Sequence, residues 1–443
     1  MMSTIKRSMF PSAIVQASLA LATGASSSQG QELKAEGAME PDKTYVDRID
    51  HGPGNPRNGE GAFVTLKDGR ILHAYGKYYG AGVANPIGEC DDNLLSRIDA
   101  RVSSDNGVTW TDDMILLQNE ADLNTRDPSL LRLQDGRIAL FYMRNNGLDD
   151  AQIFMRTSSD ETRTWSEPVR VTQAPGAFYC VHDRVIQLKN GRIVAPCAFY
   201  RNTRKPESIT DWGSYDERAL VIFYLSDDGG KTWREAADWL ALPKHPYIEE
   251  RNYTLQEAMS LFTNRLLSPL PFGFGLQEPV VVELTTGQLW ALARTTTGRQ
   301  FEFFSDDNGE HWTLPQPSWF CSPFSPLSMK RLSTGDLLAI WNDHDRQQWG
   351  HLPYPTPGLV SLRTPLATAI SSDEGKTWKH RRLLEAEPYN PAKVLCYTAI
   401  HQVGDHVLLS YFDGVQPERK FTQGYCVRRL PLAWFYEEEI IPK

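Results

Sequence analysis

Acidic, phenolic and basic side chains recur at equivalent places in a repeated sequence pattern. The first residues of six apolar runs are Glu60, Asp127, His182, Glu278, Pro326 and Tyr397. A carboxylate such as that of Glu278 can accept the phenolic proton of Tyr397, so that the phenol oxygen becomes a nucleophile. A phenolic nucleophile suits an anionic substrate, because an attacking carboxylate would be repelled by it.

Basic residues occupy neighbouring strand ends in the same pattern. Lys77, Arg144 and Arg294 end the second runs, and Arg218 and Arg363 precede a later repeat. Strands that return to one edge would place these side chains beside the first residues of the runs. Because arginines bind carboxylates and sulfates through paired hydrogen bonds, the cluster favours a small anionic ligand. The alternative is that polar residues simply flank the strands.

The elements that must position these residues are predicted to be β-hairpins. The six first runs are Glu60–Leu66, Asp127–Leu133, His182–Leu188, Glu278–Leu284, Pro326–Leu332 and Tyr397–Val403. Each is followed by a turn that contains glycine, such as Asp68-Gly69 or Asn190-Gly191, and then by a second β-rich run. Such dipeptides between alternating β-runs are strong hairpin signals.

A second repeat, S-x-D-x-G-x-T-W, follows five of these hairpins. The copies begin at Ser103, Ser158, Ser226, Ser305 and Ser371, with Thr162 in place of glycine in the second and His311 in place of threonine in the fourth. The Asp carboxylate can accept turn N–H groups, and the glycine supplies a positive φ. Each hairpin and its repeat would form one four-stranded sheet, which predicts an all-β, six-bladed propeller. We expect Tyr45–Ile49 and Gly424–Arg428 to close it.

These repeats resemble the Asp-box, or BNR, repeats of the sialidase superfamily, over roughly residues 45–430. The resemblance implies that the boxes are structural and lie away from the active face. It also implies that Tyr397 is the nucleophile and Glu278 its base. Arg294 and Arg363 would bind the anionic group, with Arg57 as the third arginine.

The resemblance does not identify the general acid. The corresponding segment, Ala74 to Tyr78, contains no carboxylate. The loop after it supplies Asp91 and Asp92, and we take Asp92 as the catalytic carboxylate. Glu60 and Asp127 are rivals for this role. We assign them, together with Asp183, to substrate binding.

Composition excludes several other classes of function. The chain of 443 residues has a net charge of −9, which argues against nucleic acid or an anionic membrane as partner. The six cysteines and the scattered histidines show no metal-ligand spacing, so we expect neither a metal site nor a cofactor. Disulfides are permitted, but their pairing cannot be read. No apolar segment is long enough for a transmembrane helix.

The chain divides into a leader, a linker and one domain. Residues 1–30 resemble a secretory signal, because Lys6 and Arg7 precede an apolar run and small residues; a disordered tail is the alternative. Residues 31–44 read as a linker and residues 45–435 as the propeller. The excursion 234–277, with helical composition at Thr254–Leu267, is a surface decoration or a substrate lid.

These observations predict a secreted or periplasmic exo-glycosidase that removes a terminal anionic sugar, sialic acid or similar, from a glycan. Two alternatives remain: a glycan-binding propeller without catalysis, which the missing carboxylate would explain, and a different propeller glycosidase or a polysaccharide lyase.

Overall fold

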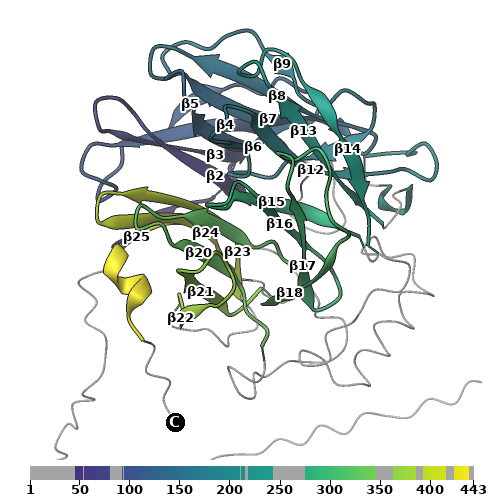
Figure 1. Cartoon of the computed structure of the whole chain (residues 1–443). Helices are drawn as coiled ribbons and strands as arrows, with labels where there is room; N and C mark the ends of the chain where they lie inside the picture. The colour runs from purple at the N-terminus through teal and green to yellow at the C-terminus, as the bar shows by residue number, and fades with distance from the viewer. Residues whose placement is uncertain are drawn as a thin grey trace, which may run out of the picture. The chain divides into compact units, whose positions relative to one another are not determined.

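Antiparallel β-sheets make up almost all of the regular structure in the computed structural model (Figure 1). The structure describes residues 45–52, 54–79, 92, 94–209, 211–214, 218–242, 275–345, 363–385, 393–415 and 424–438. Within these ranges the helical segments are two short 3-10 turns, η2 (Trp212–Ser214) and η3 (Leu432–Tyr436). The predicted all-β class is therefore confirmed. The leader, the linker and the helical segment Thr254–Leu267 lie outside the described residues.

The first half of the domain forms one 13-stranded sheet. Its strands are β2 (Arg57–Thr65), β3 (Ile71–Tyr79), β4 (Leu95–Ser103), β5 (Met114–Leu117), β6 (Asn124–Arg132), β7 (Ile138–Gly147), β8 (Asp150–Ser158), β9 (Val169–Arg170), β10 (Ala177–Tyr179), β11 (Ile186–Gln187), β12 (Ile193–Tyr200), β13 (Leu220–Ser226) and β14 (Arg234–Leu240). Antiparallel groups within it are joined only by single parallel pairs, Ser96 with Asn124 and Ala177 with Ala151. The sheet therefore consists of successive antiparallel units that touch at one edge.

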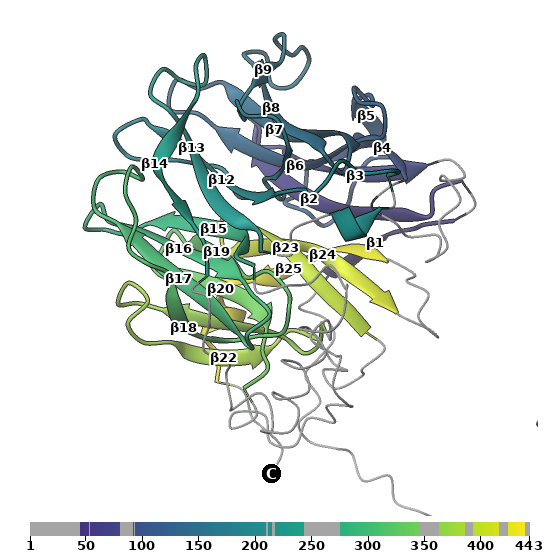
Figure 2. The ribbon, with the colours of Figure 1, turned by 90° about the vertical axis from the view of Figure 1, so that its right-hand side faces the viewer.

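Three separate four-stranded sheets follow (Figure 2). The first holds β15 (Gln277–Glu283), β16 (Leu289–Arg294), β17 (Arg299–Ser305) and β18 (Gln316–Cys321), and the second holds β19 (Ser328–Arg331), β20 (Leu337–Asn342), β21 (Leu366–Ser371) and β22 (Lys379–Leu383). The third holds β23 (Lys393–Val403), β24 (His406–Val415), β25 (Tyr425–Pro431) and β1 (Tyr45–Ile49). Because β1 pairs antiparallel with β25, the predicted pairing of the N-terminal and C-terminal strands is confirmed. The count of six blades stays a prediction.

All six predicted hairpins pair as expected. They are β2 with β3, β6 with β7, β11 with β12, β15 with β16, β19 with β20, and β23 with β24. Alternating apolar residues and a turn dipeptide are sufficient to specify such a register. The first strands of four of these hairpins, β2, β6, β15 and β23, carry Glu60, Asp127, Glu278 and Tyr397.

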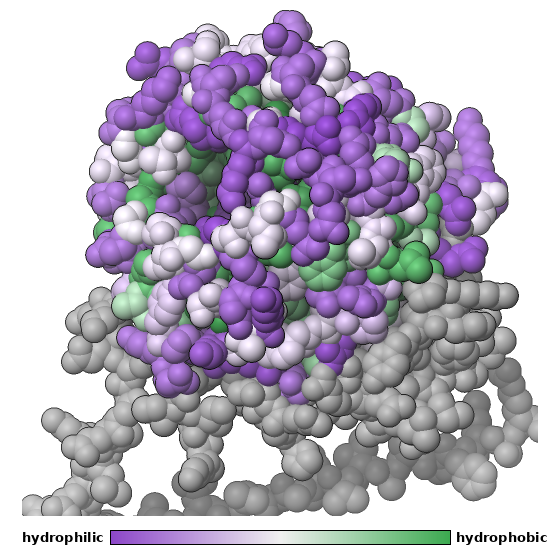
Figure 3. Space-filling view, viewed as in Figure 1, coloured by the Kyte–Doolittle hydropathy of each residue, from purple (hydrophilic) through white to green (hydrophobic). Residues whose placement is uncertain are grey.

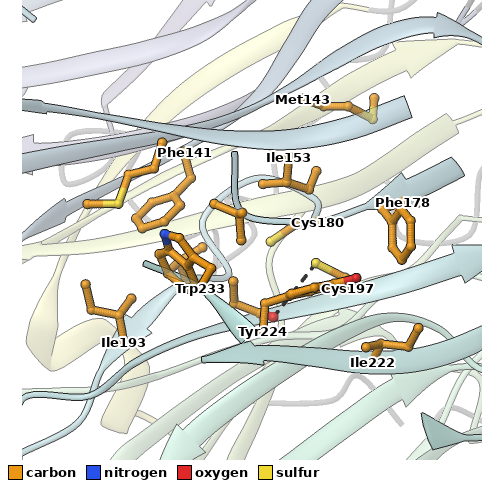
Figure 4. Packing of buried hydrophobic residues seen from close by; sticks show 14 of the residues in the cluster. Phe141, Met143, Ile153, Phe178, Cys180, Ile193, Cys197, Ile222, Tyr224 and Trp233 are labelled. Atoms are coloured by element: carbon orange, nitrogen blue, oxygen red, sulfur yellow. Dashed lines mark hydrogen bonds between the residues drawn. The ribbon is translucent and has the colours of Figure 1, made fainter. Parts of the chain in front are cut away.

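The apolar core lies between successive sheets. One cluster joins Phe141 and Ile153 of β7 and β8 to Cys197 and Tyr224 of β12 and β13, with Trp233 of an Asp-box among them (Figure 4). Comparable clusters join each later pair of neighbours, and a last one joins Phe63 and Ile71 of β2 and β3 to β23, β24 and β25. The series of clusters therefore returns from the last sheet to the first, as a closed propeller requires.

The described cysteines lie inside this core as free thiols. They are Cys180, Cys197, Cys321, Cys396 and Cys426, and all are buried. The surface, in contrast, is mainly hydrophilic, with hydrophobic residues in small separated patches on the face that Figure 3 shows.

Candidate active site

Four of the candidate site residues sit at the same distortion of their strands. Register shifts interrupt β2, β6, β15 and β23 beside Glu60, Asp127, Glu278 and Tyr397. At these four residues φ is 47°, 58°, 48° and 57°, the left-handed region that side chains rarely adopt. A β-bulge of this kind re-aims a side chain, and strained residues concentrate at functional sites. The shared bulge is therefore the local feature that presents these four side chains.

Tyr397, Glu278 and Arg294 form one hydrogen-bonded group, as the sequence predicted. The phenol of Tyr397 donates to Glu278 Oε1 at 2.8 Å, and Arg294 Nη1 donates to Glu278 Oε2 at 2.6 Å. The same nitrogen donates to the Tyr397 oxygen at 3.0 Å. Glu278 and Arg294 are buried, and Tyr397 is partly exposed. The carboxylate of Glu278 therefore accepts the phenolic hydrogen of Tyr397 directly.

Two opposing effects act on the phenol of Tyr397. Burial and the negative charge of Glu278 raise the pKa of Tyr397 above its usual value, whereas the charges of Arg294 and Arg363 lower it and so favour the phenolate. Because the pKa is raised overall, the phenol is protonated at neutral pH.

Arg363 and Arg294 retain donors for an anion. Arg363 lies with its guanidinium carbon 5.1 Å from the Tyr397 ring centre, and its Nη1 is 3.0 Å from Cys396 Sγ. No carboxylate of the described residues lies within ion-pair distance of it. Arg294 stacks on Phe324, 3.6 Å from the ring centre, and its Nε has no hydrogen-bond partner. Both arginines contact Tyr397, one over its ring and one at its oxygen.

Arg57 belongs to a second group of charges. Its Nη2 donates to Glu60 Oε1 at 2.5 Å, and its Nη1 donates to Asp92. The guanidinium lies over the rings of Tyr78 and Phe412, at 4.5 and 5.3 Å from their centres. Because Phe412 packs edge-on against Tyr397, Arg57 lies one aromatic ring away from Tyr397.

Sequence reasoning missed Arg126 in this second group. Its Nη1 lies 3.6 Å from Asp92 Oδ1 and 3.8 Å from Asp127 Oδ2, and its Nε has no hydrogen-bond partner. One signal could have revealed it. In Arg126-Asp127-Pro128, as in Gln277-Glu278-Pro279, an acidic residue is followed by proline. Arg126 therefore comes directly before the bulged residue of its strand, as Gln277 does.

Asp183 links strands across the site. Its φ is 53°, so Asp183 and not His182 takes the left-handed position in this repeat. The carboxylate binds Lys330 Nζ at 2.6 Å and accepts from the backbone N–H of Ile400 at 3.1 Å. These contacts join the turn before β11 to β19 and β23, so they favour a structural role, and substrate binding by Asp183 stays a prediction.

Other basic residues that the sequence placed at the mouth have partners elsewhere. Lys77 donates to Asp113 at 2.5 Å, and Arg144 donates to Glu120 at the same distance. Arg218 is exposed. The expectation that Lys77 and Arg144 join the anion cluster was therefore wrong, because Lys77 pairs with Asp113, just before β5, and Arg144 pairs with Glu120, between β5 and β6. Asp91 lies outside the described residues.

The described residues contain no candidate metal-binding site. No group of three or more His, Cys, Asp or Glu side chains among them could hold a metal ion. The described part of the chain also contains no helix with the length and apolar character of a membrane span.

Comparison with known proteins places the chain in a family. The model of the BNR repeat-like domain matches residues 88–413. A curated sialidase from Bacteroides fragilis (strain YCH46) is 23% identical over 353 residues, covering 73% of this chain and 54% of that protein. The chain thus spans about half the length of that relative.

Solved structures with the same fold include a protein of unknown function from Dyadobacter fermentans DSM 18053, with a TM-score of 0.59, 18% identity and coverage of 88% of this chain and 98% of that one. The NanB sialidase of Streptococcus pneumoniae matches with a TM-score of 0.58 at 13% identity, over 87% of this chain and 70% of that one. The Trypanosoma rangeli sialidase matches with a TM-score of 0.57 at 14% identity, over 88% and 60%. At these identities the likeness concerns the fold.

Proposed function

Because the chain belongs to the BNR repeat-like family of the sialidase superfamily, we propose that it is an exported exo-glycosidase of sialidase type. It hydrolyses the bond to a terminal anionic sugar, sialic acid or similar, in a glycan. The contact between the Tyr397 phenol and Glu278 Oε1, at 2.8 Å, carries this proposal.

Each residue of the site has a separate role in the reaction. Tyr397 attacks the anomeric carbon while Glu278 takes its proton, and Arg294 Nη1 positions both groups by donating a hydrogen bond to each. Arg363 and the free Nε of Arg294 bind the anionic group of the sugar, and Arg57 is a third cation one ring away. Three carboxylates, Asp92, Glu60 and Asp127, compete for the role of general acid.

The substitution Tyr397→Phe tests the proposal. It keeps the ring that packs against Phe412 and Arg363 but removes the attacking oxygen. We expect an unchanged fold and a loss of at least about 10²-fold in kcat, the lower range for a positioned catalytic group. The measurement is release of free sugar from methylumbelliferyl glycosides of sialic acids and uronic acids.

Tyr142→Phe is the matched control, because Tyr142 also donates to a glutamate, Glu120, at 2.6 Å. Its turnover should stay near that of the wild type. Near-normal turnover by a folded Tyr397→Phe variant would remove Tyr397 as nucleophile. A product with a new ultraviolet-absorbing double bond would identify a lyase, and binding of a glycan without any product would identify a binding module.

A further inference from the structure

Two cysteines lie opposite each other at the end of one antiparallel strand pair. β10 pairs with β12 in a register that sets Tyr179 opposite Ala198, and Cys180 is the residue after Tyr179. Continuing this register by one residue sets Cys180 opposite Cys197. Opposite residues of an antiparallel pair have Cα atoms about 4.5 or 5.5 Å apart, and both spacings lie within the range that a disulfide spans.

The packing of the two side chains agrees with this register. Cys180 and Cys197 belong to the same apolar cluster and are 3% and 0% exposed. Figure 4 shows their sulfur atoms turned toward each other. Burial raises the pKa of the Cys197 thiol well above its usual value, and a side-chain interaction with the Cys180 thiol adds to this effect. The two thiols are therefore direct neighbours.

The remaining described cysteines are not placed in this way. Cys396 and Cys426 belong to two different apolar clusters, and Cys321 belongs to none of them. Among the cysteines that the structure describes, Cys180 and Cys197 are thus the one pair that shares a cluster. A cross-link that needs no movement of the strands can join only these two.

We propose that Cys180 and Cys197 form a disulfide in the exported protein. The assignment rests on export in the proposed function, because disulfides persist in oxidising compartments and are rare in the cytosol. The bond would tie β12 to the turn that follows Cys180 and carries His182 and Asp183. The ring centre of His182 lies 5.8 Å from that of Tyr397, so the cross-link would fasten a segment that lines the candidate site.

The redox step balances with a second disulfide as the oxidant, either glutathione disulfide or the disulfide of a protein oxidoreductase. One cysteine loses its proton to water, and its thiolate attacks the oxidant to form a mixed disulfide and release one thiolate. The other cysteine then loses its proton and attacks the mixed disulfide. The bond between Cys180 and Cys197 forms, the second thiolate leaves, and the oxidant has gained the two electrons that the cysteine pair lost.

Burial determines when this bond can form. The folded core excludes the oxidant from both thiols, and the raised pKa of Cys197 keeps its reactive thiolate scarce. The bond therefore forms while the chain folds, before the core closes. For this reason the test refolds the full chain from urea in a buffer of reduced and oxidised glutathione, with a second sample refolded under a reductant.

Peptide mapping of the refolded wild type identifies the pairing. After alkylation of free thiols, cleavage at arginine and lysine without reduction leaves Cys180 alone in the peptide 171–184 and Cys197 alone in the peptide 193–201. We expect a species with the summed mass of these two peptides less two hydrogen atoms, which reduction separates. If both cysteines are instead alkylated, or are joined to other cysteines, the inference is wrong.

Urea unfolding of the oxidised and the reduced samples gives a second readout. The cross-link restricts the unfolded chain, so the oxidised wild type should have the higher midpoint. Cys197→Ala should have the same midpoint in both samples. Cys426→Ala is the matched control and should keep the difference, because Cys426 is also 0% exposed and its Sγ, like that of Cys197, donates to a backbone oxygen at 3.8 Å.

The remaining outcomes separate this inference from the glycosidase proposal. An oxidised wild type that is no more stable than the reduced one would overturn the stabilising disulfide, and so would a difference that persists in Cys197→Ala. None of these measurements uses a glycoside. Unlinked cysteines would therefore leave the glycosidase proposal standing, and linked peptides in a chain that hydrolyses no anionic glycoside would leave this inference standing.

Discussion

Arg363 is the residue at which anion binding can be separated from the chemistry. It touches the Tyr397 ring and Cys396 but has no ion-pair partner among the described carboxylates, so its donors are available. For Arg363→Lys we expect a loss of roughly 10- to 100-fold in kcat/KM, since a lysine cannot reproduce the paired hydrogen bonds of the guanidinium. Steady-state kinetics with the best anionic aryl glycoside would measure it.

The control for this substitution is Arg144→Lys, which changes the same side chain in an ion pair with Glu120. We expect kcat/KM to remain close to that of the wild type there. Equal kinetics for Arg363→Lys and the wild type would show that the anionic group binds elsewhere.

The sequence predicted one half of the candidate site better than the other. Tyr397, Glu278 and Arg294 follow from repeat register, because each begins or ends a strand of a hairpin that pairs as expected. Arg126 was missed although it obeys the same register. The contact of Asp92 with Arg57 and Arg126 could not be derived, since Asp92 belongs to the connection between β3 and β4, where no periodicity fixes the position of a side chain.

At the scale of the element, the Asp-box is a turn that fastens one sheet to the preceding one. In the first copy, Asp105 Oδ1 accepts from the N–H groups of Val108 and Thr109, and Ser103 Oγ accepts from Gly107 N. In later copies the tryptophan crosses to its neighbour: Trp312 stacks on Phe223 of β13 with ring centres 4.1 Å apart. The predicted turn is confirmed, whereas the contact between sheets was not foreseen, because a local motif does not show which sheet its outer face meets.

The box glycines give a test of this fastening. Gly375 has φ 82°, and an added Cβ would lie 2.2 Å from the Trp290 ring of β16. Gly335, in a hairpin turn, has φ 93° but no atom near its Cβ position. We expect Gly335→Ala to cost about 1 kcal/mol of unfolding free energy, from the positive φ alone. Gly375→Ala should cost roughly 2–4 kcal/mol, because overpacking adds to the strain.

Urea unfolding of the two variants measures the difference. Gly335→Ala is the matched control, since the substitution and the backbone conformation are the same. Equal losses in the two variants would mean that the box does not depend on close packing against the preceding sheet.

At the scale of the whole domain, the last sheet is completed by pairing strands from opposite ends of the described chain. β1 pairs with β25 over its five residues, and Arg48 forms an ion pair with Asp413 of β24. The sequence predicted this pairing because the sixth hairpin lacked a box to complete its sheet. It could not predict that the first three antiparallel units merge into one sheet, because the single parallel pairs between them arise where neighbouring strand ends converge.

The five boxes together predict how stability depends on pH. Hydrogen bonds from the turn hold the pKa of Asp105, Asp160, Asp228, Asp307 and Asp373 at about 2, against burial where there is some. An unfolded aspartate has a pKa of about 3.9. Because the folded pKa is lower, this stabilisation is complete above about pH 4 and is lost as the pH falls towards 2. In urea unfolding at several pH values, the free energy of unfolding should therefore fall steeply below about pH 4.

Asp105→Asn tests this dependence. The variant should have a lower free energy of unfolding than the wild type at neutral pH. This difference should narrow below pH 4, where protonation weakens the same bonds in the wild type. A gap that stays constant down to pH 2 would show that ionisation of this carboxylate contributes nothing to the turn.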